Sequence, residues 1–295
     1  MLAPGLLGRP LAPVGALETR MDKVLAQNPF TKAGVSIALW DAFARTVGLP
    51  LATVLGGPYR EEIPIKLSLS GDTADLARAH RAAAAAGFGA FKVKVGLGPA
   101  GDVARFARAR ELVGPDALLG ADANGGWTRA EARETVPALI EHGLAFIEQP
   151  VAAPDLDGMR SLRDLGVPVV ADESVFGVDD LVRVIRAEAA DVVSVYVGKC
   201  RGPGRALQLA RVAEAFGLDV LIGSNGELGV GAAAQLHVAA ALPALSAFPS
   251  DIIGAHYYDD DVLAAPLDSD GRRVRLGPEA GLGVAVREDL LKEFA

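Results

Sequence analysis

Three acidic residues close three consecutive β-like runs of this 295-residue sequence. Asp122 ends LLGAD, Glu148 ends AFIE and Asp172 ends VVAD, at steps of 26 and 24 residues. In a parallel barrel the carboxyl ends of the strands open on the face where active sites are found. Three carboxylates at close range repel one another, so this spacing predicts a divalent cation between them. Oxygen donors without a His or Cys pair favour Mg²⁺, with Mn²⁺ as a substitute.

Each acid taken singly could instead cap the helix that follows its strand, as Asp often does in βα loops. The repetition over three successive units favours the cation site over three separate caps.

Two lysines lie one unit earlier, in the run FKVKV. Strand alternation turns Lys92 and Lys94 to one face and the apolar residues to the other. Repulsion between two ammonium groups and their burial lower a lysine pKa, so one amine could accept a proton near neutral pH. Only seven of the 29 basic residues are lysine, which makes a pair in one apolar strand informative. Beside a metal ion, these residues predict proton abstraction α to a carboxylate, because both cations stabilise the negative charge that develops.

Short β-branched runs alternate along the chain with Ala- and Arg-rich segments of helical period, and these elements must position the charged residues. The alternation is typical of repeated βα units around a parallel sheet. The expected strands are residues 63–70, 90–95, 118–122, 145–148, 169–172, 192–196 and 220–223, with a weaker eighth around 245–248. Thr128 and Glu131 form a predicted capping box, and Asp72 or Thr73 caps an earlier helix. The expected fold class is α/β, with a TIM-like (β/α)7β barrel.

The first 60 residues follow a different pattern. Two helical stretches, around residues 18–27 and 31–46, precede the break Gly56-Gly57-Pro58. We therefore predict a partial, mainly helical N-terminal cap over residues 1–60, the barrel over 61–265, and a C-terminal segment over 266–295 that returns toward the cap.

Composition and charge exclude several classes of protein. A net charge of -8 and a pI near 5.1, with no basic stripe, argue against a nucleic-acid partner. The single cysteine, Cys200, excludes an internal disulfide framework and favours a reducing compartment such as the cytoplasm. Prolines interrupt the apolar N-terminus, and the Ala-rich region 231–248 carries polar residues, so no targeting segment or membrane span is expected. The sequence is compatible with a homo-oligomer and does not define the oligomeric state.

Four segments, in their order and spacing, resemble the barrel signature of the enolase superfamily, in its mandelate racemase and muconate lactonizing enzyme family: FKVKVG, GADANGGW, AFIEQP and VVADES. The resemblance covers residues 30–295 and implies a muconate-cycloisomerase-like isomerase or lyase that forms an enediolate from a small carboxylic acid. It also implies that three residues are the metal ligands: Asp122, Glu148 and Asp172.

The same resemblance implies roles for the remaining candidates. Lys94 would be the general acid/base and Lys92 its electrostatic neighbour, while Asn124 would bind substrate or support the site. The segment GSNGELGVG resembles the seventh-strand loop of muconate cycloisomerases and would bring Glu227 near the site.

One departure from the family pattern concerns the sixth strand. Relatives carry a second catalytic lysine there, but one 24-residue step from Asp172 arrives at Tyr196. Lys199, three residues later, matches a further lysine of the relatives, so it is not assigned as the missing base. Tyr196 is a possible phenolic acid or oxyanion donor. A racemase needs an acid/base group on each face of the carbon, so this departure favours one-base cycloisomerization or elimination.

A second departure is at the N-terminus. In the family a three-stranded cap sheet precedes the cap helices and selects the substrate, whereas this chain begins after that sheet. Either the start of the sequence is placed too far downstream, or the chain is an N-terminally shortened member whose site is open to water.

Three alternatives stay open. An N-acylamino-acid racemase or o-succinylbenzoate synthase is the nearest enzymatic one, and a non-catalytic metal-binding relative is another. The third is an NAD-binding oxidoreductase, because Gly96-Leu97-Gly98-Pro99-Ala100-Gly101 matches GxGxxG between a strand and a helix.

Overall fold

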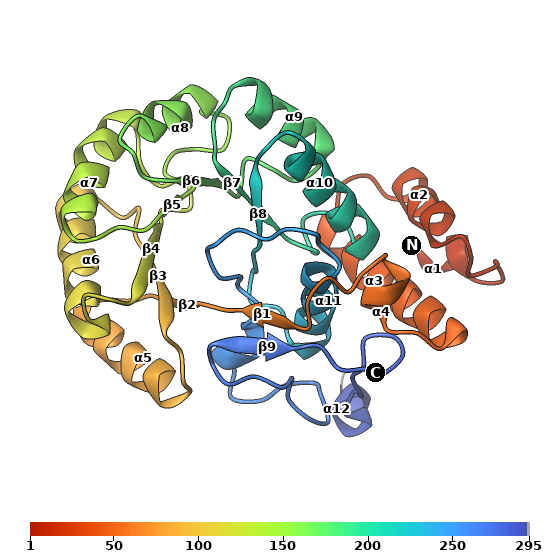
Figure 1. The fold of residues 1–295 in the computed structure, drawn as a ribbon. Helices are drawn as coiled ribbons and strands as arrows, with labels where there is room; N and C mark the ends of the chain where they lie inside the picture. The colour runs from red at the N-terminus through yellow and green to blue at the C-terminus, as the bar shows by residue number, and fades with distance from the viewer. Residues whose placement is uncertain (294–295) are drawn as a thin grey trace.

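A curled sheet of seven parallel strands forms the centre of the molecule, with helices around its outer side (Figure 1). The computed structural model describes residues 1–293. The strands, in spatial order, are β2 (Leu67–Leu69), β3 (Ala90–Lys94), β4 (Leu118–Asp122), β5 (Ile147–Glu148), β6 (Val169–Ala171), β7 (Val192–Val195) and β8 (Asp219–Ile222). The helices that alternate with them are α5 (Thr73–Ala85), α6 (Pro99–Val113), α7 (Arg129–Glu141), α8 (Leu156–Arg163), α9 (Val178–Arg186), α10 (Pro203–Ala215) and α11 (Gly229–Ala240). The predicted α/β alternation is confirmed.

Local sequence determines where these helices begin. The Thr128 hydroxyl accepts a hydrogen bond from the Glu131 backbone N–H, and the Thr128 backbone N–H donates to the Glu131 carboxylate, which is the predicted capping box. Asp72 caps α5 by accepting from the N–H groups of Ala74 and Asp75.

Residues 246–251 join the two edges of the sheet. The N–H groups of Ser246 and Asp251 donate to carbonyls of β8, and Ser250 exchanges backbone hydrogen bonds with the chain around Lys66 on the other side. The predicted eighth strand, 245–248, was placed too early, because the pairing extends to Asp251 and no regular strand forms. Pro249 interrupts the ladder since it has no N–H group to donate.

The predicted strand 63–70 divides into two short strands. β1 (Glu62–Pro64) leaves the main sheet and pairs antiparallel with β9 (Arg273–Arg275), whereas β2 joins β3. Pro64 lacks a donor at the division, so one continuous ladder cannot form there.

The N-terminal helices gather on one side of the curled sheet, beside α10 and α11 (Figure 1). They are α1 (Ala3–Leu6), α2 (Val14–Val24), α3 (Pro29–Val47) and α4 (Leu51–Val54). The C-terminal part contains η1 (Gly254–Tyr257) and α12 (Glu288–Glu293). It contacts the N-terminal helices, because Arg45 donates to the Val284 carbonyl and Leu51 N–H to the Gly281 carbonyl. Within residues 1–293, no helix combines the length and apolarity needed to cross a membrane.

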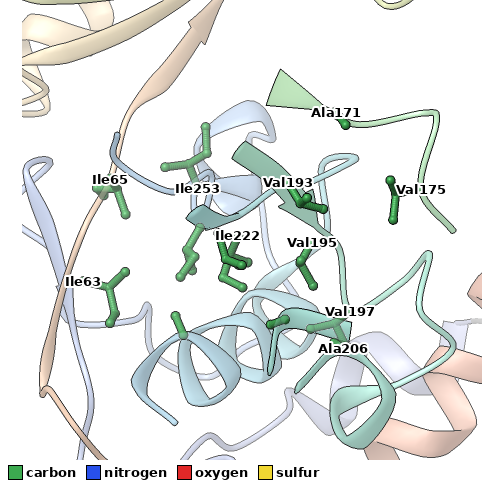
Figure 2. Close-up of a cluster of buried hydrophobic side chains, with 14 of the residues drawn as sticks. Ile63, Ile65, Ala171, Val175, Val193, Val195, Val197, Ala206, Ile222 and Ile253 are labelled. Carbon is green, nitrogen blue, oxygen red and sulfur yellow. The ribbon is translucent and has the colours of Figure 1, made fainter. Parts of the chain in front are cut away.

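Buried apolar side chains pack on both faces of the curled sheet. Outside it, side chains such as Val193, Val195 and Ile222 lie with Ala206 in one large buried cluster (Figure 2). Inside it, a smaller cluster contains Phe146, Val170, Val192 and Leu221. Because side chains alternate along a strand, the inward positions that follow Phe146 and Val170 on their strands are Glu148 and Asp172. The inner apolar cluster therefore lies beneath the charged residues.

Gly120 makes room for the Phe146 ring, because a Cβ atom at this position would overlap the ring. Gly120→Ala is expected to lower the free energy of unfolding by about 1–3 kcal/mol, as overpacking in a tight core does. Urea unfolding would measure this change. Gly101→Ala, in α6 where a Cβ meets nothing within 4 Å, is the control and should gain about 0.5–1 kcal/mol. Equal midpoints for the Gly120 variant and the unaltered chain would contradict this account.

Candidate functional site

Charged residues meet at the carboxyl ends of β3, β4 and β5. In the strand register Lys94 lies opposite Asp122, and Asp122 lies opposite Glu148. Asp172 follows the last residue of β6, and Tyr196 follows the last residue of β7. Consecutive parallel strands thus bring these five predicted residues to one end of the sheet.

Lys92 lies buried between carboxylates. Its Nζ donates to Glu148 Oε2 at 2.7 Å and lies 3.2 Å from Asp122 Oδ2 and 3.5 Å from Asp251 Oδ2. Burial opposes a charge on Lys92, but Asp251, Glu148 and Asp122 outweigh it and raise its pKa well above the usual value. With its carboxylate partners as they stand, Lys92 remains positively charged.

The pKa values of the two carboxyl groups on β4 and β5, Asp122 and Glu148, are shifted in opposite directions. Burial raises the pKa of Glu148 to about 8, and Asp122 and Asp172 add to this rise against the opposing effect of Lys92. Burial also acts on Asp122, but Lys92 and Lys94 outweigh it and lower its pKa. Glu148 therefore gains more than Asp122 from additional positive charge nearby. Its Oε1 atom is buried without a hydrogen-bond partner among the described residues.

Lys94 is held at the mouth of the sheet. Its Nζ donates to Asp122 Oδ2 at 2.7 Å and to Asn124 Oδ1 at 2.8 Å. Asn124 has φ 46°, a left-handed conformation that Asn tolerates, and its amide donates to Glu173 Oε1 at 2.8 Å. Asn124 therefore orients Lys94 and connects it to the loop after β6.

Asp172 is held by two residues that follow β7, Tyr196 and Lys199. Tyr196 OH donates to Asp172 Oδ2 at 2.7 Å, and Lys199 Nζ donates to the Asp172 carbonyl at 2.7 Å and to Oδ1. Burial and the Asp172 charge raise the pKa of Tyr196 well above its usual value, so its hydroxyl stays protonated. Lys199 is also buried, with its ammonium 4.1 Å from the centroid of the Tyr196 ring. Both residues support Asp172.

Glu227 lies in the loop before α11. Its Oε2 accepts hydrogen bonds from Ser224 Oγ and, at 3.0 Å, from Gln235 Nε2. These partners belong to its own loop and helix, whereas the other predicted residues contact one another across strands.

The donor chemistry of the site fits a hard divalent cation, since the three strand-end acids supply only oxygen atoms and Glu148 Oε1 accepts no hydrogen bond from any residue of the 1–293 range. As the side chains stand, each acid is paired with a lysine: Asp122 with Lys94, Glu148 with Lys92 and Asp172 with Lys199. Over residues 1–293, no three His, Cys, Asp or Glu side chains are grouped closely enough to share one ion. Binding a cation would require carboxylate oxygens to turn from ammonium groups to the ion.

Three contacting residues were missed in the sequence. Asp251 was missed because the eighth strand was placed too early for its end to be identified. Lys66 is the one charged residue of the predicted strand 63–70, without the second lysine that marks the FKVKV run. Glu173, next to Asp172 in VVADES, could have been found from that motif.

The GxGxxG loop is occupied by a side chain of the protein itself. Asp102 Oδ2 accepts hydrogen bonds from the N–H groups of Gly96, Leu97 and Gly98 at 2.9–3.0 Å. It also accepts from Trp127 Nε1 at 2.8 Å. These N–H groups are the ones a pyrophosphate would need, so the loop does not support dinucleotide binding.

A cavity of about 1130 Å³ lies between α2, α3 and the loops after β6 and β7. Of the predicted site residues only Lys199 lines it. It is therefore a neighbour of the charged cluster and not its centre.

Comparisons with known protein families match both parts of the chain. Residues 74–290 match the model described as "Enolase C-terminal domain-like". Residues 1–56 match the model of the mandelate racemase / muconate lactonizing enzyme N-terminal domain.

Individual relatives agree with these matches. Muconate cycloisomerase 1 of Rhodococcus opacus is 32% identical over 99% of this chain and 79% of its own length. The N-succinyl-L-Arg/Lys racemase of Bacillus cereus is 31% identical over 99% and 79%. Among solved structures, 2-chloromuconate cycloisomerase from Rhodococcus opacus 1CP superposes with a TM-score of 0.94 and 31% identity, covering 100% of this chain and 82% of that one.

Proposed function

Because the chain belongs to the mandelate racemase and muconate lactonizing enzyme family of the enolase superfamily, we propose that it removes a proton α to the carboxylate of a small acid. The relatives named above, a cycloisomerase and a racemase, are isomerases. Lys94 would be the single acid/base of the reaction. A muconate-cycloisomerase-like isomerization or an elimination fits this best.

The observation that carries the proposal is the difference in solvent exposure among the side chains of four lysines. The Lys94 side chain is 37% exposed, whereas those of Lys92 and Lys199 are 4% exposed and that of Lys66 is fully buried. A general base must reach within hydrogen-bonding distance of the proton it takes. Lys94 meets this requirement at the mouth of the sheet, while the other three ammonium groups are covered.

The opposite side of the site favours one-base chemistry. One 24-residue step from Asp172 arrives at Tyr196, the position at which the family pattern leads us to expect a second catalytic lysine, and the Tyr196 hydroxyl donates to Asp172. Lys199 donates to the same carboxylate. With both groups engaged, proton removal and return take place on the Lys94 face. The second candidate is an N-acylamino-acid racemase-like or o-succinylbenzoate synthase-like activity, which the racemase relative supports.

Asp122, Glu148 and Asp172 would hold a divalent cation, with Mg²⁺ preferred and Mn²⁺ as its substitute. Bound there, the ion would supply positive charge for a carboxylate that gains negative charge. Lys92 would add a second fixed charge, Asn124 would orient Lys94, and Glu227 would line the substrate side.

The proposed scaffold is a (β/α)7β barrel whose eighth position is taken by residues 246–251. Residues 1–60 would form the cap, 61–265 the barrel and 266–295 the segment returning to the cap; the last two residues lie outside the described part of the chain.

Deuterium exchange tests this function. With Mg²⁺ in D₂O and a panel that includes muconolactone and N-succinyl-L-arginine, we expect deuterium to enter the α position of a turned-over acid with retention of configuration. Proton NMR and chiral chromatography measure the two quantities. A racemized product would contradict one-base chemistry. Cation binding without exchange on any acid would favour a non-catalytic relative.

A further inference from the structure

Lys66 and Asp251 form a buried ion pair that the proposed reaction does not use. Lys66 is fully buried, and its Nζ donates to Asp251 Oδ2 at 2.8 Å and to the Pro249 carbonyl at 2.6 Å. Its ammonium also lies 5.7 Å from the centroid of the Phe146 ring. The pair joins the residue before β2 to the segment that closes the sheet.

The same carboxylate oxygen faces a second ammonium group. Asp251 Oδ2 is 3.5 Å from Lys92 Nζ, compared with 2.8 Å from Lys66 Nζ. Lys92 is in turn 2.7 Å from Glu148 Oε2. Lys66 and Lys92 thus share Asp251, and Lys66 is the nearer of the two.

Removing the nearer cation would change this balance. A buried carboxylate without a partner is strongly unfavourable, and attraction between charges is large where water is excluded. Asp251 Oδ1 already lacks a hydrogen-bond partner among the described residues. Without Lys66, the Lys92 ammonium would be the closest available cation for Asp251.

Resting on the function proposed above, we infer that Lys66 is a positioning residue: by engaging Asp251, it keeps the Lys92 ammonium from moving to Asp251. Lys92 then stays on the Asp122 and Glu148 side of the cluster, where it would stabilise the developing charge of the substrate. Lys66 acts through Asp251 and Lys92 and does not touch the substrate.

The crystal structure of Lys66→Met tests the inference without any substrate. We expect Lys92 Nζ to approach Asp251 Oδ2 to about 2.8 Å, a normal ion-pair hydrogen bond, and to leave Glu148 Oε2. Lys32→Met is the matched control, because Lys32 is also buried and pairs with Asp22 at 2.8 Å away from the charged cluster. A Lys92 ammonium that stays on Glu148 in Lys66→Met would overturn the inference.

Kinetics separate positioning from folding. On an acid that the unaltered enzyme turns over, Lys66→Met should lower kcat about 10- to 100-fold with a smaller change in KM, the size expected from a displacement of about 1 Å. The double variant Lys66→Met/Asp251→Asn removes the charge that attracts Lys92 and should recover most of kcat. Lys32→Met should leave kcat unchanged. If the double variant is as slow as the single one, Lys66 does not act through Asp251.

The two readouts also distinguish this inference from the proposed function. If no acid is turned over, the proposed function fails, while the position of Lys92 in Lys66→Met still decides the role of Lys66.

Discussion

Lys94→Ala is expected to reduce α-proton exchange by about 100- to 10,000-fold, the usual contribution of a positioned acid/base group. Lys94 is the accessible ammonium of the charged cluster, with 37% of its side chain exposed, and Asp122 and Asn124 orient it. The variant should fold normally, since a half-exposed side chain adds little to the core. Exchange followed by NMR in D₂O, on an acid that the unaltered enzyme turns over, measures the loss.

Lys23→Ala is the matched control, because Lys23 is an exposed lysine of α2 and should be dispensable. Added primary amines should partly restore exchange in Lys94→Ala if a missing amine is the defect. Exchange within twofold of the unaltered enzyme would remove Lys94 from the chemistry and leave the proposed reaction without a base.

Glu148→Gln is expected to weaken Mg²⁺ and Mn²⁺ binding by more than about 100-fold, beyond the usual cost of losing a group that only supports a ligand. The change keeps the shape of the side chain and removes a charge that burial disfavours. Lys92 would still have Asp122 at 3.2 Å and Asp251 at 3.5 Å, so its charge stays compensated. Exchange activity should fall in parallel, and EDTA should abolish it in the unaltered enzyme.

Calorimetric titration with Mn²⁺ measures the affinity directly, without a substrate. Glu141→Gln, at an exposed position near the end of α7, is the control and should bind the ion normally. Unchanged Mn²⁺ affinity in Glu148→Gln would contradict the proposed ligand set and the proposal that a cation binds at this end of the sheet.

The βα alternation could be predicted because each unit carries its own local signals. Strands need β-branched runs, and helices need caps such as Thr128 with Glu131, and both kinds of signal lie within a few neighbouring residues. The meeting of Lys94, Asp122 and Glu148 also followed, because strand alternation and parallel order leave few possible arrangements for strand-end residues.

The closing segment could not be predicted in the same way. Residues 246–251 are held by hydrogen bonds to β8 and to the chain around Lys66, nearly two hundred residues away in sequence. Pro249 weakens the strand signal locally, and only the closed path of the sheet makes Asp251 a neighbour of Lys66 and Lys92.

By itself, the sequence determined the kinds of groups at the site and the strand ends on which they stand, because period and spacing are local properties of a chain. The tertiary structure decided which charge pairs with which: Lys92 with Glu148, Lys199 and Tyr196 with Asp172, and Lys66 with Asp251. Pairing depends on distances of a few ångströms between side chains on different strands and on how deeply these side chains are buried. Both are set only when the whole sheet closes on itself.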